Sequence, residues 1–240
     1  MESLTSVLIG IQARSTSVRF PGKCFEPLGN KRLLDHVIDS CKRAAIYSNK
    51  YSYRKNYTTN VALLIPLNDP IKKGFSSQVD IIEGSEYDVL SRYQKAQKKY
   101  DADYICRITG DCPLIPPYII SKHISLAIVG RYDYVSNVDE SCRLSLDGID
   151  CEVISKRMLE WLCNETKSES EREHVTIRAR THPPIWSNRA FTASFFDHSD
   201  IKLSVDTIED LQKVRDHYER VGKKLQYAEK LYGRDSIHRF

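Results

Sequence analysis

The chain has 240 residues, of which 41% are hydrophobic, so it is long enough to bury a substantial core. Its formal charge of +4 is small and its acidic and basic residues are interleaved, which argues against a nucleic-acid-binding surface and favours a local cationic site for a small phosphorylated ligand. The apolar runs are too short or too polar to cross a bilayer, and Met1 is followed by Glu2 rather than by a basic segment and a long apolar run, so we expect a cytoplasmic protein without membrane association.

The predicted elements alternate between strand and helix along the whole chain. Short β-branched and apolar runs predict strands at 6–13, 60–66, 78–84, 103–109, 132–137, 150–154 and 201–206, and amphipathic patterns predict helices at 31–44, 87–100, 116–128, 155–166, 169–180 and 207–222, with a polar surface connection at 47–60. This alternation predicts an α/β fold with a mostly parallel central sheet and helices on both faces. No linker or repeat interrupts it, so we expect residues 1–240 to form one domain.

Seven cysteines, an odd number without a Cys-x-x-Cys pair, argue against a disulfide framework and a structural zinc site. We expect them to be reduced and mostly buried.

The first unusual loop, "IQARSTSVRFPGK", follows the first predicted strand. It carries Arg14, Arg19 and Lys23 among small hydroxylated residues, a composition that can wrap a polyphosphate. It matches neither the Walker A pattern nor the G-x-G-x-x-G pattern. By itself it is equally compatible with a solvated basic loop.

Two further loops each place an aspartate after a predicted strand. In "RITGDCPLI" Asp111 is either a cap for the helix at 116 or a ligand, and in "LSVDTIEDL" Asp206 precedes Thr207, a good start for a capping box. The ligand site of a parallel sheet lies beyond the carboxyl ends of its strands, where these loops begin. Together the two aspartates beside a cationic loop predict an oxygen-ligand site for Mg²⁺, and metal plus polyphosphate suggests nucleotide chemistry.

Six ordered segments give the chain a family resemblance over about residues 7–221. The segments "IQARSTSVRFPGK…PLGNKRLLDHVI", "EGSEYDVLSRY", "RITGDCPLI", "DGIDCEVIS", "EREHVT" and "LSVDTIEDL" resemble those of the cytidylyltransferases, and most closely the subgroup of spore coat polysaccharide biosynthesis proteins of the F type. The resemblance implies a Rossmann-like nucleotidyltransferase fold and transfer of CMP from CTP to an acidic sugar or polyol-phosphate-like acceptor, with release of pyrophosphate, in surface polysaccharide or glycan biosynthesis.

The resemblance also implies roles for individual residues. Asp111 and Asp206 would hold Mg²⁺ and, with Arg14 and Lys23, form the catalytic set. The nucleotide-binding residues would be Ala13, Arg14, Ser15, Ser17, Arg19, Lys23, Ser85, Arg92 and Asp111, and the acceptor-binding residues Asp150, Glu152, Arg172 and His174. For Arg19 a role in the loop's own structure is open as well, and His174 is the one motif histidine that could act as a base.

Some alternatives stay open at this level. Glu152 could be a strand-edge charge, Arg172 a surface helix pair and His174 an ordinary helix histidine. Thr16 stands where relatives have a glycine, whose freedom to adopt a positive φ would let the backbone approach the nucleotide. A non-catalytic nucleotide- or sugar-binding homologue and a metal-dependent glycosyltransferase are the rival functions, although no D-x-D motif supports the second.

The family resemblance further implies a homodimer, with a dimerisation and acceptor hairpin at about 138–154. Nothing else in the sequence bears on assembly.

Overall fold

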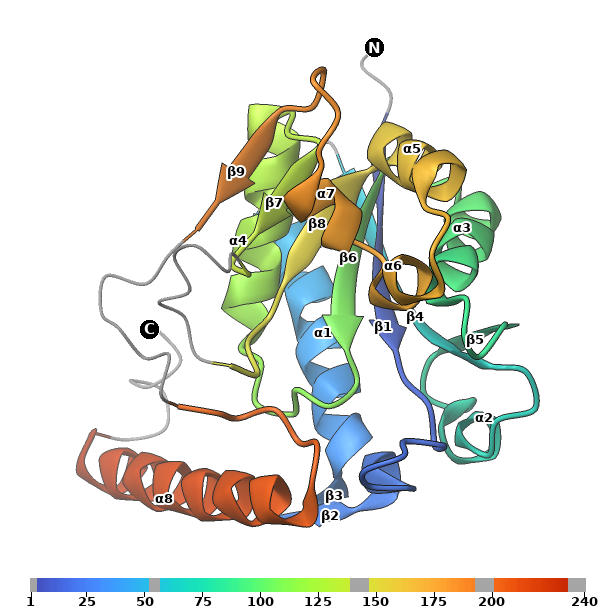
Figure 1. The fold of residues 1–240 in the computed structure, drawn as a ribbon. Coiled ribbons are helices and arrows are strands. Elements are labelled where there is room, and N and C mark those ends of the chain that lie inside the picture. Colours follow the sequence, from blue (N-terminus) through green and yellow to red (C-terminus); the bar gives the residue numbers. More distant parts are fainter. Residues whose placement is uncertain (1–3, 52–56, 139–146, 193–200, 233–240) are drawn as a thin grey trace.

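The fold is built on a seven-stranded sheet with the strand order β5-β4-β1-β6-β8-β7-β9 (Figure 1). The computed structural model describes residues 4–51, 57–138, 147–192 and 201–232. The strands are β1 (Thr5–Gln12), β2 (Pro27–Leu28), β3 (Lys31–Arg32), β4 (Tyr57–Pro66), β5 (Asp80–Gly84), β6 (Tyr104–Thr109), β7 (Tyr134–Ser136), β8 (Glu152–Ser155) and β9 (Arg189–Phe191). The helices are α1 (Leu33–Tyr51), α2 (Ile71–Phe75), α3 (Val89–Tyr100), α4 (Pro117–Gly130), α5 (Lys156–Glu165), α6 (Glu169–His174), α7 (Ile177–Thr181) and α8 (Ile208–Tyr232), with a 3₁₀ turn, η1, at Lys23–Phe25.

The sheet is mostly parallel, as predicted. β1 pairs in parallel with β4 on one side and β6 on the other, β4 with β5, and β7 with β9. Among these strands β8 alone is reversed, because it pairs antiparallel with both β6 and β7. β1 is apolar along most of its length and buried on both faces, as expected of a central parallel strand.

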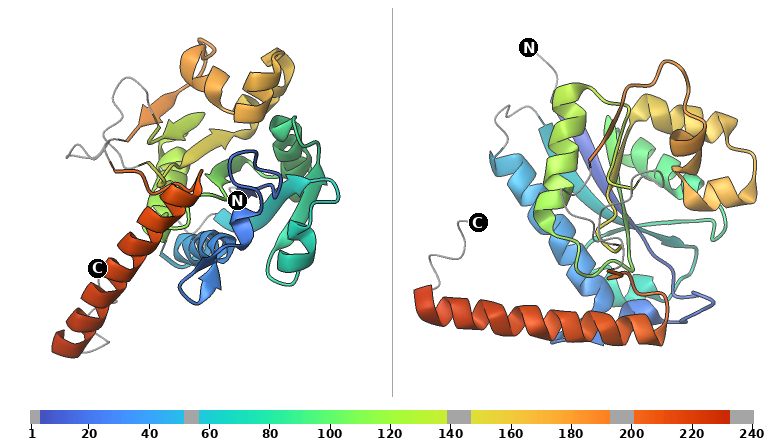
Figure 2. Two further views of the ribbon diagram at one scale, coloured as in Figure 1. Left: turned by 60° about the horizontal axis from the view of Figure 1, so that its bottom comes forward. Right: turned by 60° about the vertical axis from the view of Figure 1, so that its left-hand side comes forward.

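Helices cover both faces of the sheet, which confirms the predicted layers (Figures 1 and 2). Val7, Ile9 and Ile11 of β1 pack in one core with apolar residues of α1 and α4. Leu8 points to the opposite face and packs in a second core with residues of α3 and α5. The alternation follows from the two-residue period of a strand.

Two predicted elements differ in the structure. The segment 201–206 forms no strand and contributes only a bridge from Lys202 to Asp147, because Leu203 and Val205 instead bond to loop backbone and Val205 packs against α8. The helix predicted at 169–180 is two helices, α6 and α7. Val175 between them has φ +56°, which ends α6, and no glycine or proline marks this break in the sequence.

Smaller elements went unpredicted. They are the β2–β3 hairpin, α2 and edge strand β9, and α1 and β4 extend into the range 47–60 that we expected to be a loop. The predicted hairpin at 138–154 lies partly outside the described residues. Each described cysteine is free, and all but the half-buried Cys163 are buried, which confirms that prediction for this part of the chain. Within the described residues, no helix combines the length and the apolar content that a membrane crossing requires.

The start of α8 has the predicted capping box. The Thr207 hydroxyl accepts a hydrogen bond from the Asp210 amide at 3.3 Å, and the Asp210 carboxylate accepts from the amides of Asp206 and Thr207 at 3.0 and 3.1 Å. Capping therefore occupies Thr207 and Asp210 and leaves the Asp206 carboxylate for other contacts. From there α8 extends away from the sheet (Figure 2).

Candidate active site

The loops after β1 and β6 begin side by side at the centre of the sheet. Gln12, the last residue of β1, is in register with Thr109, the last residue of β6, and the Gly110 amide donates to the Gln12 carbonyl at 2.8 Å. A Cβ on Gly110 would lie 2.9 Å from that of Ala13, so only glycine allows this approach. The chain runs from β1 outward through β4 to β5 and then returns to β6 on the other side of β1, so this is the topological switch point, where ligands of such sheets bind.

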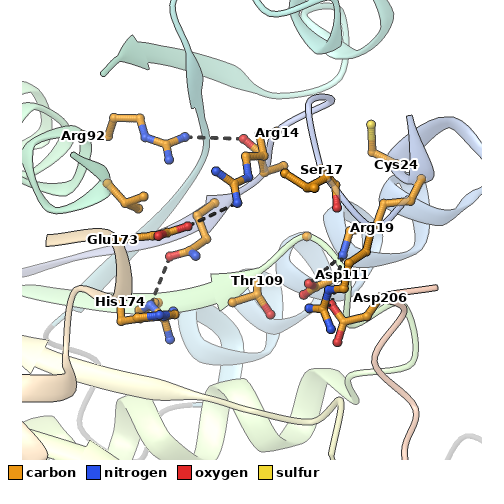
Figure 3. Close-up of a pocket in the computed structure, with 17 residues that line it drawn as sticks. Arg14, Ser17, Arg19, Cys24, Arg92, Thr109, Asp111, Glu173, His174 and Asp206 are labelled. Atoms are coloured by element: carbon orange, nitrogen blue, oxygen red, sulfur yellow. Dashed lines mark hydrogen bonds and ion pairs between the residues drawn. The ribbon is translucent and has the colours of Figure 1, made fainter. Parts of the chain in front are cut away.

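A pocket of about 350 Å³ opens at this position (Figure 3). It is charged, with more cationic than anionic side chains. Its lining residues are Gln12, Ala13, Arg14, Ser17, Val18, Arg19, Lys23, Cys24, Val89, Arg92, Arg107, Thr109, Gly110, Asp111, Glu173, His174 and Asp206.

One end of the pocket is organised around Lys23, at the start of η1. Gly22 before it has φ +73°, a value that favours glycine in this turn. The Lys23 ammonium lies 3.0 Å from the Asp111 carboxylate and 3.6 Å from that of Asp206, and it donates to the Val205 carbonyl at 2.6 Å. The structure thus brings together one cation and two aspartates that are far apart in the sequence.

The two aspartates are placed to share a cation. Asp111 does not cap α4, whose N-terminus has no side-chain cap, so the capping interpretation is wrong. Burial alone would raise the pKa of Asp111, but the adjacent Lys23 ammonium lowers it below its ordinary value, so the carboxylate is ionised. Both carboxylates converge on the ammonium, which occupies the position of a cation between them, and their oxygens are the ligands that Mg²⁺ prefers.

Arg19 completes this end of the pocket. Its guanidinium lies 2.9 Å from the Asp206 carboxylate, and about two thirds of its side chain is exposed. Within the described residues no group of three or more histidine, cysteine or acidic side chains could hold a metal ion. A metal held by the two aspartates would therefore need further ligands from substrate or water.

The other end of the pocket holds Arg14 and Arg92 (Figure 3). Arg14 pairs with Glu173 of α6 at 3.2 Å. Arg92 is 2% exposed and donates to the carbonyls of Leu64 at 2.8 Å and Ala13 at 3.4 Å, while its Nε is buried without a partner. Arg92 therefore fixes the backbone where the cationic loop leaves β1.

Two hydrogen bonds attach the loop after β1 to the segments that follow β4 and β5. The Ser15 amide donates to Asp69 at 2.9 Å, and the Thr16 hydroxyl donates to Glu86 at 2.5 Å. Thr16 is not among the residues with positive φ, so the backbone at this position does not require a glycine. Ser17 lines the pocket and Ser15 does not.

Like Ser15, the predicted site residues Ser85 and Arg172 lie outside the pocket lining. Ser85 accepts a hydrogen bond from the Asp88 amide at 3.1 Å, and Arg172 pairs with the Asp88 carboxylate at 2.8 Å. Since Asp88 caps α3, this pair fastens α6 to the start of α3. His174 ends α6 and does line the pocket.

Glu152 is a buried charge below the pocket, and neither it nor Asp150 lines the cavity. It is 1% exposed, forms an ion pair with Arg107, and accepts hydrogen bonds from the hydroxyls of Tyr134 at 2.5 Å and Thr176 at 2.9 Å. Burial would raise its pKa, but the adjacent arginines lower it, so Glu152 is ionised. It is a structural charge, buried rather than at a strand edge.

Sequence reasoning missed four polar residues of the lining: Gln12, Arg107, Thr109 and Glu173. A usable signal was the two-residue period of β6, which places Arg107 and Thr109 on one face of the strand, just before the loop that carries Asp111. Glu173 lies in the segment "EREHVT" between Arg172 and His174, and that position was the available signal for it.

Comparison with known proteins gives a consistent result. A family model described as cytidylyltransferase matches residues 8–234. The spore coat polysaccharide biosynthesis protein SpsF of Bacillus subtilis is 29% identical over 92% of this chain and 90% of its own, and the 3-deoxy-manno-octulosonate cytidylyltransferase of Geobacter metallireducens is 26% identical over 48% of this chain and 42% of its own. The solved structure of a cytidylyltransferase from Leptospira borgpetersenii superimposes with a TM-score of 0.75 at 26% identity, covering 93% of this chain and 96% of that one.

Proposed function

The chain belongs to the cytidylyltransferase family, a CTP-dependent nucleotidyltransferase family, and we propose that it transfers CMP from CTP to an acidic sugar or a related acceptor with release of pyrophosphate. The observation that carries the proposal is the pairing of Asp111 and Asp206 around one cation, beside a cationic loop at the switch point of the sheet. A binding protein needs no such paired carboxylates, and the family membership favours the cytidylyltransferase over a glycosyltransferase.

The cationic residues account for binding of the triphosphate. Arg14, Arg19 and Lys23 line one pocket, and each is paired with a carboxylate in this structure. Phosphate oxygens can replace those partners, so the cations become available as CTP binds. The arrangement keeps the cations in place before substrate arrives, which reduces the reorganisation needed during reaction.

The reaction is attack of an acceptor oxygen on the α-phosphorus, with pyrophosphate leaving. Negative charge accumulates on the phosphate oxygens, and Arg14 and Lys23 are placed to stabilise it. Asp111 and Asp206 would hold Mg²⁺, which when bound neutralises phosphate charge. His174 lines the same pocket and is the candidate to accept the acceptor's proton.

The acceptor class and the biological setting come from the relatives. SpsF is named for spore coat polysaccharide biosynthesis, and the Geobacter relative for 3-deoxy-manno-octulosonate, an acidic sugar. We extend both to this chain as an acidic sugar or polyol-phosphate-like acceptor in surface polysaccharide or glycan biosynthesis. A cytoplasmic location and a homodimer formed through residues near 138–154 belong to the same proposal.

The experiment is CTP-dependent pyrophosphate release with Mg²⁺ and a panel of acidic sugars and polyol phosphates. Asp111→Asn and Asp206→Asn should each nearly abolish release, while CTP binding measured by calorimetry partly survives because the cations are kept. Lys202→Gln is a matched control, since it contacts Asp206 at 3.1 Å from outside the pocket and should retain most activity. Full turnover in either aspartate variant would refute the metal assignment, and the absence of CTP-dependent release with every acceptor would favour the binding-protein alternative.

A further inference from the structure

Arg107 is a cation of the pocket that forms an ion pair with a buried carboxylate. It lies on β6, its side chain is 13% exposed, and it lines the cavity. Its Nη1 donates to the buried Glu152 carboxylate, and its Nε donates to the Gln12 side chain at 3.1 Å. Two anchors therefore fix the plane of the guanidinium against the floor of the pocket.

One edge of this guanidinium is unused. Within the described part of the chain, Nη2 of Arg107 donates no hydrogen bond, although Nε and Nη1 both do. Since Arg107 lines the cavity and the partners of its other nitrogens are side chains of the sheet, the unused edge is the one available to a ligand. A guanidinium fixed in one orientation loses little conformational entropy on binding a planar anion.

The buried charges around Arg107 do not balance. Glu152 is the one carboxylate between two guanidinium groups, because Arg180 of α7 lies 4.0 Å from it on the other side. Nε of Arg180 is buried without a hydrogen-bond partner. The cluster Arg107–Glu152–Arg180 thus carries one excess positive charge, and Arg107 is the member of it that lines the pocket, so one anion bound there would balance the cluster.

We propose that Arg107 binds a carboxylate of the acceptor and so makes an acidic sugar, rather than a phosphorylated polyol, the preferred substrate. The inference rests on the proposed function, which supplies the acceptor. One excess charge and one free guanidinium edge match a monoanionic, planar carboxylate, whereas a phosphate dianion calls for more cations than this floor provides. Glu152, through its ion pair, is then a positioning residue for acceptor recognition.

The triphosphate is not the natural ligand of Arg107. Arg107 lies within β6, which ends at Thr109, whereas Asp111 lies in the loop beyond the end of that strand. Lys23 and Arg19 lie at the Asp111 end of the pocket, where the phosphates are expected. The part of the pocket at Arg107 is therefore available to bind the acceptor.

The test measures binding of acidic sugars of eight and nine carbons by calorimetry, in the presence of Mg²⁺ and a CTP analogue that cannot transfer its nucleotide. Each acid is compared with its methyl ester and with glycerol phosphate. The wild-type protein should bind at least one acid roughly ten- to a hundredfold more tightly than its ester, as expected for a charge-assisted hydrogen bond. Arg107→Gln should reduce this acid preference to about onefold and leave affinity for the CTP analogue within about threefold.

Further variants separate recognition from folding. Arg107→Met combined with Glu152→Gln removes both charges of the buried pair, so the proposal can still be tested if Arg107→Gln alone fails to fold. Arg107→Lys should keep part of the acid preference. Arg178→Gln is the matched control, because Arg178 pairs with Glu171 at 3.0 Å outside the pocket lining, and it should change neither acid nor ester binding.

Several outcomes would overturn the proposal. They are an unchanged acid preference in the Arg107 variants, an equal loss of acid and ester binding as a purely structural role would give, and a wild-type protein that binds the CTP analogue but prefers glycerol phosphate or binds no acid. Failure of the wild-type protein to bind the CTP analogue would instead refute the proposed function itself.

Discussion

The substitution Glu152→Gln hardly changes the shape of the side chain, yet we expect it to destabilise the protein substantially. The side chain is 1% exposed, and removing its charge leaves the guanidinium groups of Arg107 and Arg180 buried without a counterion. Breaking a buried ion pair from one side costs about 3–5 kcal/mol. Glutamine can still accept hydrogen bonds from Tyr134 and Thr176, so we expect the lower end, about 3 kcal/mol, which for a chain of this length is a loss of roughly 6–12 °C in melting temperature.

The assay is urea unfolding followed by circular dichroism, with thermal melts in parallel. Glu171→Gln is the control, because its pair with Arg178 at 3.0 Å is partly exposed and should be worth about 0–1 kcal/mol. Adding Arg107→Met to Glu152→Gln should recover part of the loss, since fewer uncompensated charges remain. A change below about 1 kcal/mol for Glu152→Gln, or no recovery in the double variant, would show that Glu152 does not compensate these arginines.

Two other predictions concern the site and the pH dependence of stability. Lys23→Met should weaken CTP binding roughly ten- to a hundredfold by calorimetry, whereas Lys31→Met, which removes a pair with Asp39 outside the pocket, should leave it unchanged; equal affinity in both would mean that the loop is purely structural. Burial would raise the pKa of Asp35, but hydrogen bonds from Arg32 and Gln78 lower it from 3.8 to about 2. The ionised Asp35 side chain therefore contributes about 2 kcal/mol to the free energy of unfolding above pH 4, and this contribution is lost as the pH falls toward 2. Urea unfolding across this range should show the wild type losing its advantage over Asp35→Asn, and a constant difference would contradict the assignment.

Much of the fold could be predicted from the sequence because it depends on patterns among residues close together in the chain. Apolar alternation identified the central strands, and Thr207 and Asp210 form the capping box that their spacing predicted. The incorrectly predicted elements share one cause, which is that tertiary contacts outweigh the local sequence pattern. The segment 201–206 has the composition of a strand, but its backbone bonds to the loops at Asp111 and Asp147 instead of to a sheet.

The candidate site divides in the same way. Arg14, Lys23, Asp111 and Asp206 were predicted as a set, and the pocket contains all four. Glu152 was predicted on the acceptor side because the family resemblance implies that role for its motif, yet a strand residue points either toward the ligand or toward the interior, and only the pairing of β8 decides which.

By itself, the sequence determined the α/β alternation, the strand-end positions of the charged loops and the family to which they belong, because each depends on residues close together in the chain. Tertiary structure alone decided that Lys23 lies between two aspartates 95 residues apart in the sequence, that the backbone at Thr16 does not require a glycine, and that Arg107 lines the pocket and belongs to a cluster with one excess positive charge. Those properties depend on which strands are neighbours and which way each side chain points, and long-range packing fixes both.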